Sequence, residues 1–95
     1  MIDIRKPLFK LGQIMATPGA LAAMEEAGQA AWELVSRHVQ GDWGEVGAED
    51  AEANARSVED GSRILSAYHL KTGERLWVLT EADRSSTCIL LPDEY

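Results

Sequence analysis

Four side chains in two short segments of this sequence could together carry out acid–base chemistry. His38 and Asp42 stand close together near the end of one apolar-periodic segment, and Asp83 and Arg84 are adjacent in a polar stretch further along the chain. An imidazole or a carboxylate can take and return a proton, and a guanidinium can stabilise developing negative charge. If the fold brings these four side chains into one pocket, they predict a small enzyme with acid–base or hydrolytic chemistry.

The first of these regions, residues 37–44, has two interpretations. Glycines on both sides of Asp42 and Trp43 let the chain turn sharply and present a carboxylate and an indole to a partner. The structural interpretation makes Trp43 a lid on the core, since tryptophan is highly buried on average, and makes Asp42 a turn residue. In the structural interpretation Arg37 and His38 also pair favourably with the C-terminus of the helix that ends here.

The second region, residues 80–86, is a polar connection between two apolar runs. Loops on a rigid scaffold often carry recognition groups, so Glu81, Asp83 and Arg84 are candidate binding residues. The alternative is a solvated hairpin loop with a surface ion pair worth at most about 1 kcal/mol. An active site requires this loop to lie beside the turn at Asp42.

Known metal and nucleophile motifs do not occur in the sequence. The two histidines, His38 and His69, and the one cysteine, Cys88, lack the spacing of zinc sites, and there is no calcium-loop pattern. A composite site from His38, Cys88 and a carboxylate competes with the simpler interpretation of a helix-end histidine and a small buried thiol. There is also no Gly-x-Ser-x-Gly motif and no glycine-rich phosphate loop. The sequence therefore predicts no metal, no cofactor and no catalytic residue.

Helical and extended patterns indicate which elements position these residues. Apolar residues over 7–16 predict a first strand that stops at Thr17. Thr17 and Pro18 form a favourable helix start, and helical spacing continues as far as Gly28. Two further helices are expected, over residues 29–40 and 48–60.

The C-terminal third has the pattern of a β-hairpin followed by another strand. Strands are expected over residues 63–70, 75–80 and 87–91, and the first two of them form the hairpin. The expected register places Lys71 opposite Glu74, and Tyr68 opposite Trp77. An antiparallel three-stranded meander is the result.

These elements predict one α+β domain over residues 1–95. An N-terminal strand and two to three short helices precede the C-terminal three-stranded antiparallel meander. The helices are expected to pack on one face of the sheet. No repeat, linker or low-complexity tract divides the chain.

Acidic charge is concentrated in one part of the chain. Nine Lys and Arg oppose sixteen Asp and Glu, for a formal net charge of -7, and seven of the sixteen lie between Gly41 and Gly61. This charge disfavours direct contact with nucleic acid or an anionic membrane. Carboxylates on a rigid helix can instead imitate phosphates, although an acidic face also keeps a small domain in solution. With one cysteine and no apolar segment of membrane-spanning length, the chain is expected to be cytoplasmic.

Seven segments spread over nearly the whole chain carry a family resemblance. They are Leu11-Gly12-Gln13-Ile14, Ala16-Thr17-Pro18-Gly19-Ala20-Leu21, Arg37-His38, Gly41-Asp42-Trp43-Gly44, Leu65-Ser66-Ala67-Tyr68, Thr80-Glu81-Ala82-Asp83-Arg84-Ser85 and Ile89-Leu90-Leu91-Pro92. Together they resemble a family of small proteins found on bacterial plasmids and other mobile elements. Its members are often labelled plasmid-related or as restriction-modification subunits. The resemblance implies a mobile-element context and implies that residues 41–44 and 81–85 are characteristic of the group.

The expected function is noncatalytic binding of a protein partner. In its concrete form the domain is an anti-restriction or anti-CRISPR inhibitor, a DNA mimic that occupies the basic, nucleic-acid-binding surface of a host nuclease or CRISPR effector. The alternatives are the small enzyme described above and a structural or regulatory subunit, monomeric or homodimeric, that docks a partner or a second copy through an apolar strand edge or Trp43. The predicted partner-binding residues are Asp42, Trp43, Glu49, Asp50, Glu52, Asp83 and Arg84.

Overall fold

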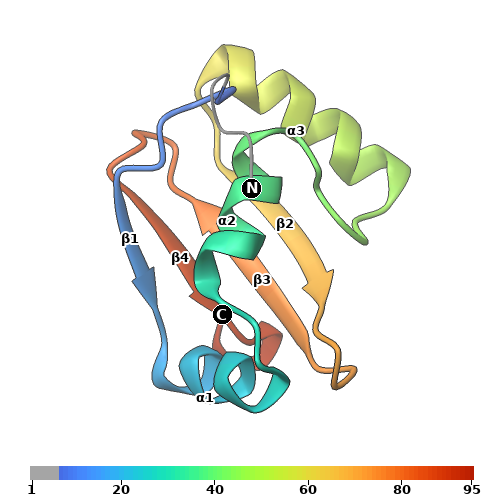
Figure 1. Ribbon diagram of the computed structural model, residues 1–95. Helices are drawn as coiled ribbons and strands as arrows, with labels where there is room; N and C mark the ends of the chain where they lie inside the picture. Colours follow the sequence, from blue (N-terminus) through green and yellow to red (C-terminus); the bar gives the residue numbers. More distant parts are fainter. Residues whose placement is uncertain (1–6) are drawn as a thin grey trace.

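Four strands and three helices are arranged along residues 7–95, the part of the chain that this computed structural model describes (Figure 1). The strands are β1 (Gln13–Ala16), β2 (Ile64–His69), β3 (Arg75–Thr80) and β4 (Ser86–Leu90). The helices are α1 (Pro18–Ala27), α2 (Ala31–Val39) and α3 (Ala48–Asp60), and a short 3-10 helix, η1 (Pro92–Glu94), follows β4. The predicted α+β class is confirmed.

The helices begin and end where local chemistry favours it. Thr17 Oγ1 accepts the Ala20 N–H (3.1 Å) at the start of α1, and Gly28 ends α1 in the left-handed conformation (φ 68°). At the start of α2 the Glu33 side chain accepts the Ala30 N–H (2.8 Å). No helix within residues 7–95 has the length and apolarity that a membrane crossing requires.

The three C-terminal strands form the predicted antiparallel meander, but the N-terminal strand joins it as a fourth strand, so the sheet is mixed and not purely antiparallel. The strand order is β1-β4-β3-β2, and β1 pairs in parallel with β4 while the other pairs are antiparallel. Before β1 the backbone approaches the β3–β4 loop closely at Gly12, where an added Cβ would lie 2.4 Å from Ser85. Because α1, α2 and α3 all intervene between β1 and β4, local pattern gives no sign of this pairing.

The β2–β3 hairpin pairs one residue away from the predicted register. Tyr68 lies opposite Leu76, and Trp77 lies opposite Ala67, so the predicted Tyr68–Trp77 pair is wrong. Side chains alternate between the two faces along a strand, so a shift of one residue changes which side chains share a face. Tyr68 is therefore buried under the helices, and Trp77 lies on the other face of the sheet.

The turn of the hairpin explains the shift. The Leu70 N–H donates to Glu74 O (2.8 Å), so Leu70, and not Lys71, lies opposite Glu74. Three residues then form the loop, and Gly73 closes it with a φ of 91°. A type I turn closed by a left-handed glycine is a common three-residue hairpin loop.

The core lies between the sheet and helices α1 and α2; in Figure 1, α2 lies in front of the sheet and α1 lies at its lower end. Tyr68, Leu76, Val78 and Ile89 from the sheet pack against α1 and α2, whose core residues are Ala20, Ala23, Met24, Leu34 and Val35. A second, smaller cluster joins Phe9, Val39 and Ile64. Beyond it α3 packs against β2 at one side of the sheet.

Candidate functional site

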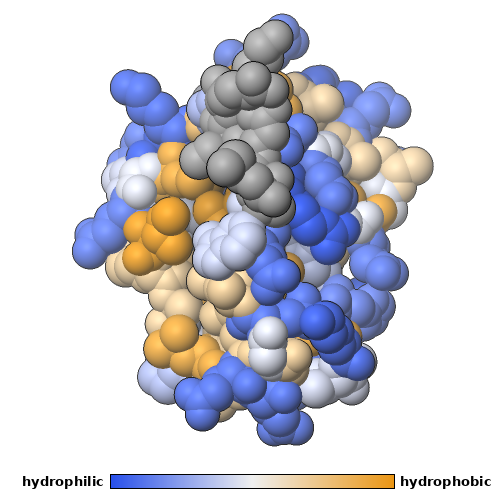
Figure 2. Space-filling model, viewed as in Figure 1, coloured by the Kyte–Doolittle hydropathy of each residue, from blue (hydrophilic) through white to orange (hydrophobic). Residues whose placement is uncertain are grey.

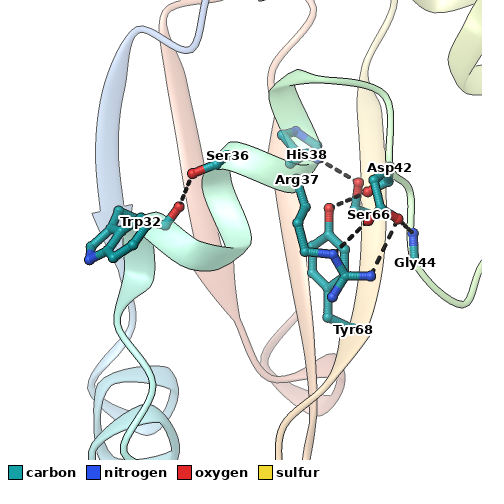
Figure 3. Close-up of polar contacts among 8 residues, drawn as sticks. All are labelled: Trp32, Ser36, Arg37, His38, Asp42, Gly44, Ser66 and Tyr68. Carbon is teal, nitrogen blue, oxygen red and sulfur yellow. Dashed lines mark hydrogen bonds and ion pairs between the residues drawn. The ribbon is translucent and has the colours of Figure 1, made fainter. Parts of the chain in front are cut away.

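The imidazole of His38 lies in a buried hydrogen-bonded chain. α2 holds His38 against the sheet with none of its surface exposed, its Nδ1 2.6 Å from Ser66 Oγ and its Nε2 2.9 Å from Thr80 Oγ1. Thr80 Oγ1 is 2.7 Å from Thr87 Oγ1, which donates to Leu11 O (2.7 Å). Figure 3 shows the His38 end of this chain. This chain of hydrogen bonds therefore crosses β2, β3 and β4 and reaches the segment that precedes β1.

His38 is not placed to act as a general base. Burial, and then the positive charge of Arg84, lower the pKa of His38 to about 4, so the ring is neutral at pH 7. Phe9 and Trp43 pack edge-on against the ring, with centroid distances of 5.2 and 6.1 Å. A general base must reach the proton that it removes, and both ring nitrogens already face hydroxyl groups.

Arg84 joins the β3–β4 loop to the end of α3. Its guanidinium donates to Ser57 O (2.8 Å), Ser62 O (2.7 Å) and Glu81 O (3.0 Å). Ser57 lies in the last turn of α3, where a cation interacts favourably with the helix dipole. Arg84 also has a left-handed backbone (φ 60°), which is uncommon for a residue with a long side chain. These contacts make Arg84 a bridge between two segments that are distant in sequence.

Asp42 pairs with Arg37 in the turn that follows α2. Arg37 Nε donates to Asp42 Oδ2 (2.7 Å), and Nη2 donates to Oδ1 (3.3 Å). The bond from Arg37, and then the Gly44 N–H, hold the pKa of Asp42 below its usual value. The Tyr68 hydroxyl donates to Asp42 O (2.6 Å), as Figure 3 shows. Asp42 thus organises the turn, while half of its side chain stays exposed.

The turn and the β3–β4 loop meet at one aromatic ring. Trp43 is half-buried and stacks on Phe9 with a centroid distance of 6.3 Å, and the guanidinium carbon of Arg84 lies 5.6 Å from the same ring centroid. Asp83 is exposed and bonds within its own loop, where its Oδ1 accepts the Ser85 N–H (2.9 Å). The four side chains that suggested an active site therefore do not converge on one pocket.

The described residues also lack a metal site. No group of three or more His, Cys, Asp or Glu that could hold an ion occurs within residues 7–95. Thr87 faces His38, so its neighbour Cys88 points to the opposite face of the sheet. Burial also raises the pKa of the Cys88 thiol, which disfavours the reactive thiolate. The composite site of His38 and Cys88 does not form.

α3 presents most of its circumference to solvent. Asn54 and Ser57 are buried and Val58 is half-buried, and they lie on the side that faces the sheet. Glu52 pairs with Arg56 at 3.4 Å, and both side chains are well exposed, so this ion pair contributes little. The predicted binding carboxylates on this helix, Glu49, Asp50 and Glu52, are all exposed.

The outer edge of β2 is closed. Asn54 Nδ2 donates to Leu65 O (2.8 Å), and the Leu65 N–H donates to Asn54 Oδ1 (3.2 Å), so one side chain takes the place of a neighbouring strand. Further along, the Ala67 N–H donates to Trp43 O (3.1 Å), and the Glu45 N–H donates to Ala67 O (2.7 Å). Every outward backbone group from Leu65 to Ala67 is thereby satisfied.

The outer edge of β1, at the other side of the sheet, is open. The N–H groups of Gln13 and Thr17 each donate to a carbonyl oxygen on the β4 side, at 3.0 Å. Because backbone groups alternate in direction along a strand, those of Ile14 and Ala16 point away from β4. Nothing else in residues 7–95 forms a hydrogen bond with the outward groups of these two residues.

An apolar groove of about 900 Å³ lies beside this open edge, between α2, β1 and the segment before β1. Its apolar lining includes Phe9, Leu11, Ile14, Trp32, Val35 and Val39. Ile14 is 50% exposed and Trp32 is 58% exposed, although both are large and apolar. Trp32 projects from the β1 side of α2 in Figure 3, and Figure 2 shows apolar surface gathered on the β1 side of this face.

Two parts of this arrangement were not predicted, although the sequence contains a signal for each. Ser66, Thr80 and Thr87 occupy positions at which their strands otherwise bury apolar residues, so they marked a buried polar chain. Asn54 lies on the apolar stripe of its helix, three residues before Ser57, and so pointed toward the sheet. The open edge gave no signal, because its exposure depends on strand order.

Comparison with known proteins gives no relative. No family model, curated protein or solved structure matches the chain. The resemblance to plasmid-borne proteins stays a prediction, and any function rests on the geometry described above.

Proposed function

We propose that this chain is a noncatalytic protein-binding domain that uses the acidic surface of α3 to contact a basic, nucleic-acid-binding surface of another protein. The observation that carries the proposal is the exposure of Glu49, Asp50 and Glu52 on a helix whose contacts with the sheet lie on its other side. The groups with catalytic chemistry have structural roles, since His38 is buried and Arg84 donates to four backbone carbonyls.

The helix supports the proposal because it holds its charges in a fixed array. Residues three apart on a helix lie on the same face, about 5–6 Å between Cβ atoms, as do Glu49 and Glu52. Asn54 anchors the helix through its two bonds to Leu65. A partner that neutralises phosphates with Lys and Arg would meet a similar row of negative charge here.

The mobile-element context expected from the sequence directs the choice of partner. Host-defence nucleases and CRISPR effector subunits hold nucleic acid in positively charged channels. An acidic domain bound in such a channel would exclude the nucleic acid. We therefore propose inhibition of host defence as the biological form of this binding.

The test is displacement of labelled DNA from purified nuclease or CRISPR effector subunits, measured at rising salt. The variant Glu49→Gln/Asp50→Asn/Glu52→Gln should bind at least about tenfold more weakly, because contacts between close opposite charges are lost. Its control is Glu25→Gln/Glu26→Gln/Glu74→Gln, which removes three exposed carboxylates elsewhere and changes the net charge from -7 equally. An equal loss in both variants, or no binding even at low salt, would contradict the proposal.

A further inference from the structure

The two edges of the sheet differ in how they are protected. Natural proteins usually shield an exposed strand edge with charge, proline, a bulge or a covering segment, because unpaired backbone groups invite another strand. At β2, Asn54 and the residues around Gly44 cover the outward backbone groups of Leu65 and Ala67. β1 is short, but its sequence Gln-Ile-Met-Ala contains neither charge nor proline, and no segment within residues 7–95 bonds to its outward backbone groups.

The open edge is also the least charged part of an acidic chain. Residues 7–24 contain no Asp or Glu, and Lys10 is the only charged residue among them. The acidic helix α3 packs on β2, at the far side of the sheet from β1. Two copies that meet through β1 therefore bring their least charged sides together and keep their acidic helices apart, which reduces the repulsion between two chains of charge -7.

The same segment is geometrically suited to pair with itself. The backbone groups of Ile14 and Ala16 both point outward, two residues apart. In an antiparallel pair with its two-fold axis at Met15, Ile14 of one chain faces Ala16 of the partner subunit, and each residue exchanges both of its hydrogen bonds. A two-fold interface is self-complementary in this way.

We propose that two copies of this chain associate through antiparallel pairing of β1, which joins the two four-stranded sheets into one of eight strands. Strands of four residues bury too little surface alone, because stable interfaces bury about 1,200–2,000 Å² in total. The exposed side chains beside the edge, Ile14, Met15 and Trp32, and the apolar groove supply the additional contact. A basic partner is a poorer occupant, because no carboxylate lies along residues 7–24 to attract it.

The first test is the mass of the full chain in solution, by light scattering or sedimentation over a range of concentrations. The wild type should have about twice the 10.4 kDa of one chain. Ile14→Lys places a charge on the edge, and Ile14→Pro removes an outward N–H that the partner strand needs, so both should be monomers. Leu21→Lys makes the same change on the exposed face of α1 and should remain a dimer.

Hydrogen exchange locates the interface and guards against misfolding. Circular dichroism should show that both Ile14 variants remain folded. In the wild type, the amides of Ile14 and Ala16 should exchange on the order of tenfold more slowly at high protein concentration than at low concentration. A monomeric wild type would overturn the proposal, even if a foreign peptide or residues 1–6 were found to protect those amides from exchange. A dimer without protection at Ile14 and Ala16 would overturn it too. The α3 variants should stay dimeric, so this proposal and the proposed function can fail separately.

Discussion

The buried imidazole of His38 should make the stability of this protein depend on pH between 6.5 and about 4, a window that lies mostly above the range in which carboxylates titrate. The pKa of His38 is about 4 in the folded chain, against an ordinary value of 6.5, because burial disfavours the charged ring. The unfolded chain therefore binds a proton between pH 6.5 and 4 that the folded chain does not bind. Where the unfolded state binds more protons, the free energy of unfolding decreases as pH falls. The contribution of His38 to stability is therefore intact above pH 6.5 and lost as pH falls toward 4.

The magnitude follows from the size of the shift. One pKa unit corresponds to 1.36 kcal/mol, so the shift of His38 amounts to a loss of about 3 kcal/mol between pH 6.5 and 4. Such a loss is a large part of the 5–15 kcal/mol that stabilises a typical domain. His38→Gln should lack this loss, because an amide can bond to Ser66 and Thr80 without titrating.

The assay is urea unfolding, followed by circular dichroism at one protein concentration, at several pH values between 7.5 and 4.5. The wild type should lose stability more steeply than His38→Gln below pH 6.5. His69→Gln, which changes an exposed histidine paired with Glu45, is the control and should keep the wild-type slope. Parallel curves for the wild type and His38→Gln, or a His38 ring that titrates near pH 6.5 by NMR, would refute the reasoning.

Two further predictions concern the closed side of the sheet. Asn54→Ala leaves the N–H and C=O of Leu65 without their partner and should lower the free energy of unfolding by about 1–3 kcal/mol, whereas Glu49→Ala on the same helix should change it by less than about 0.5 kcal/mol. Arg84→Lys keeps the charge but not the planar donor group, and should cost about 2 kcal/mol in urea unfolding. If Arg84→Lys lowers the free energy of unfolding no more than Arg56→Lys does, the bridging role of Arg84 is contradicted.

Elements set by local sequence could be predicted, and contacts set by long-range pairing could not. α3 occupies the expected residues 48–60, because its apolar stripe lies between two glycines. The hairpin register failed by one residue, because the left-handed Gly73 closes a three-residue loop that sequence pattern does not separate from a shorter one. The parallel partner of β1 could not be foreseen, since pattern does not record which strands meet across three intervening helices.

The same distinction applies to the candidate site. Exposure of Glu49 and Asp50 was foreseeable from their place on an amphipathic helix. The burial of His38 was not, because its two hydroxyl partners lie on β2 and β3, which local sequence does not bring to α2. The turn at Asp42 and the loop at Arg84 do approach each other, but the ring of Phe9 lies between them.

The closed edge of β2 also limits how large an assembly can grow. A chain with two open strand edges can add copies indefinitely and form a filament. In this chain Asn54, Trp43 and Glu45 together cover the outer edge of β2 from Leu65 to Ala67, which leaves the edge at β1 for pairing. Pairing through β1 uses that edge in both copies, and a third copy finds no free strand to extend. The residues that cover β2 thus set the difference between a finite complex and a fibre.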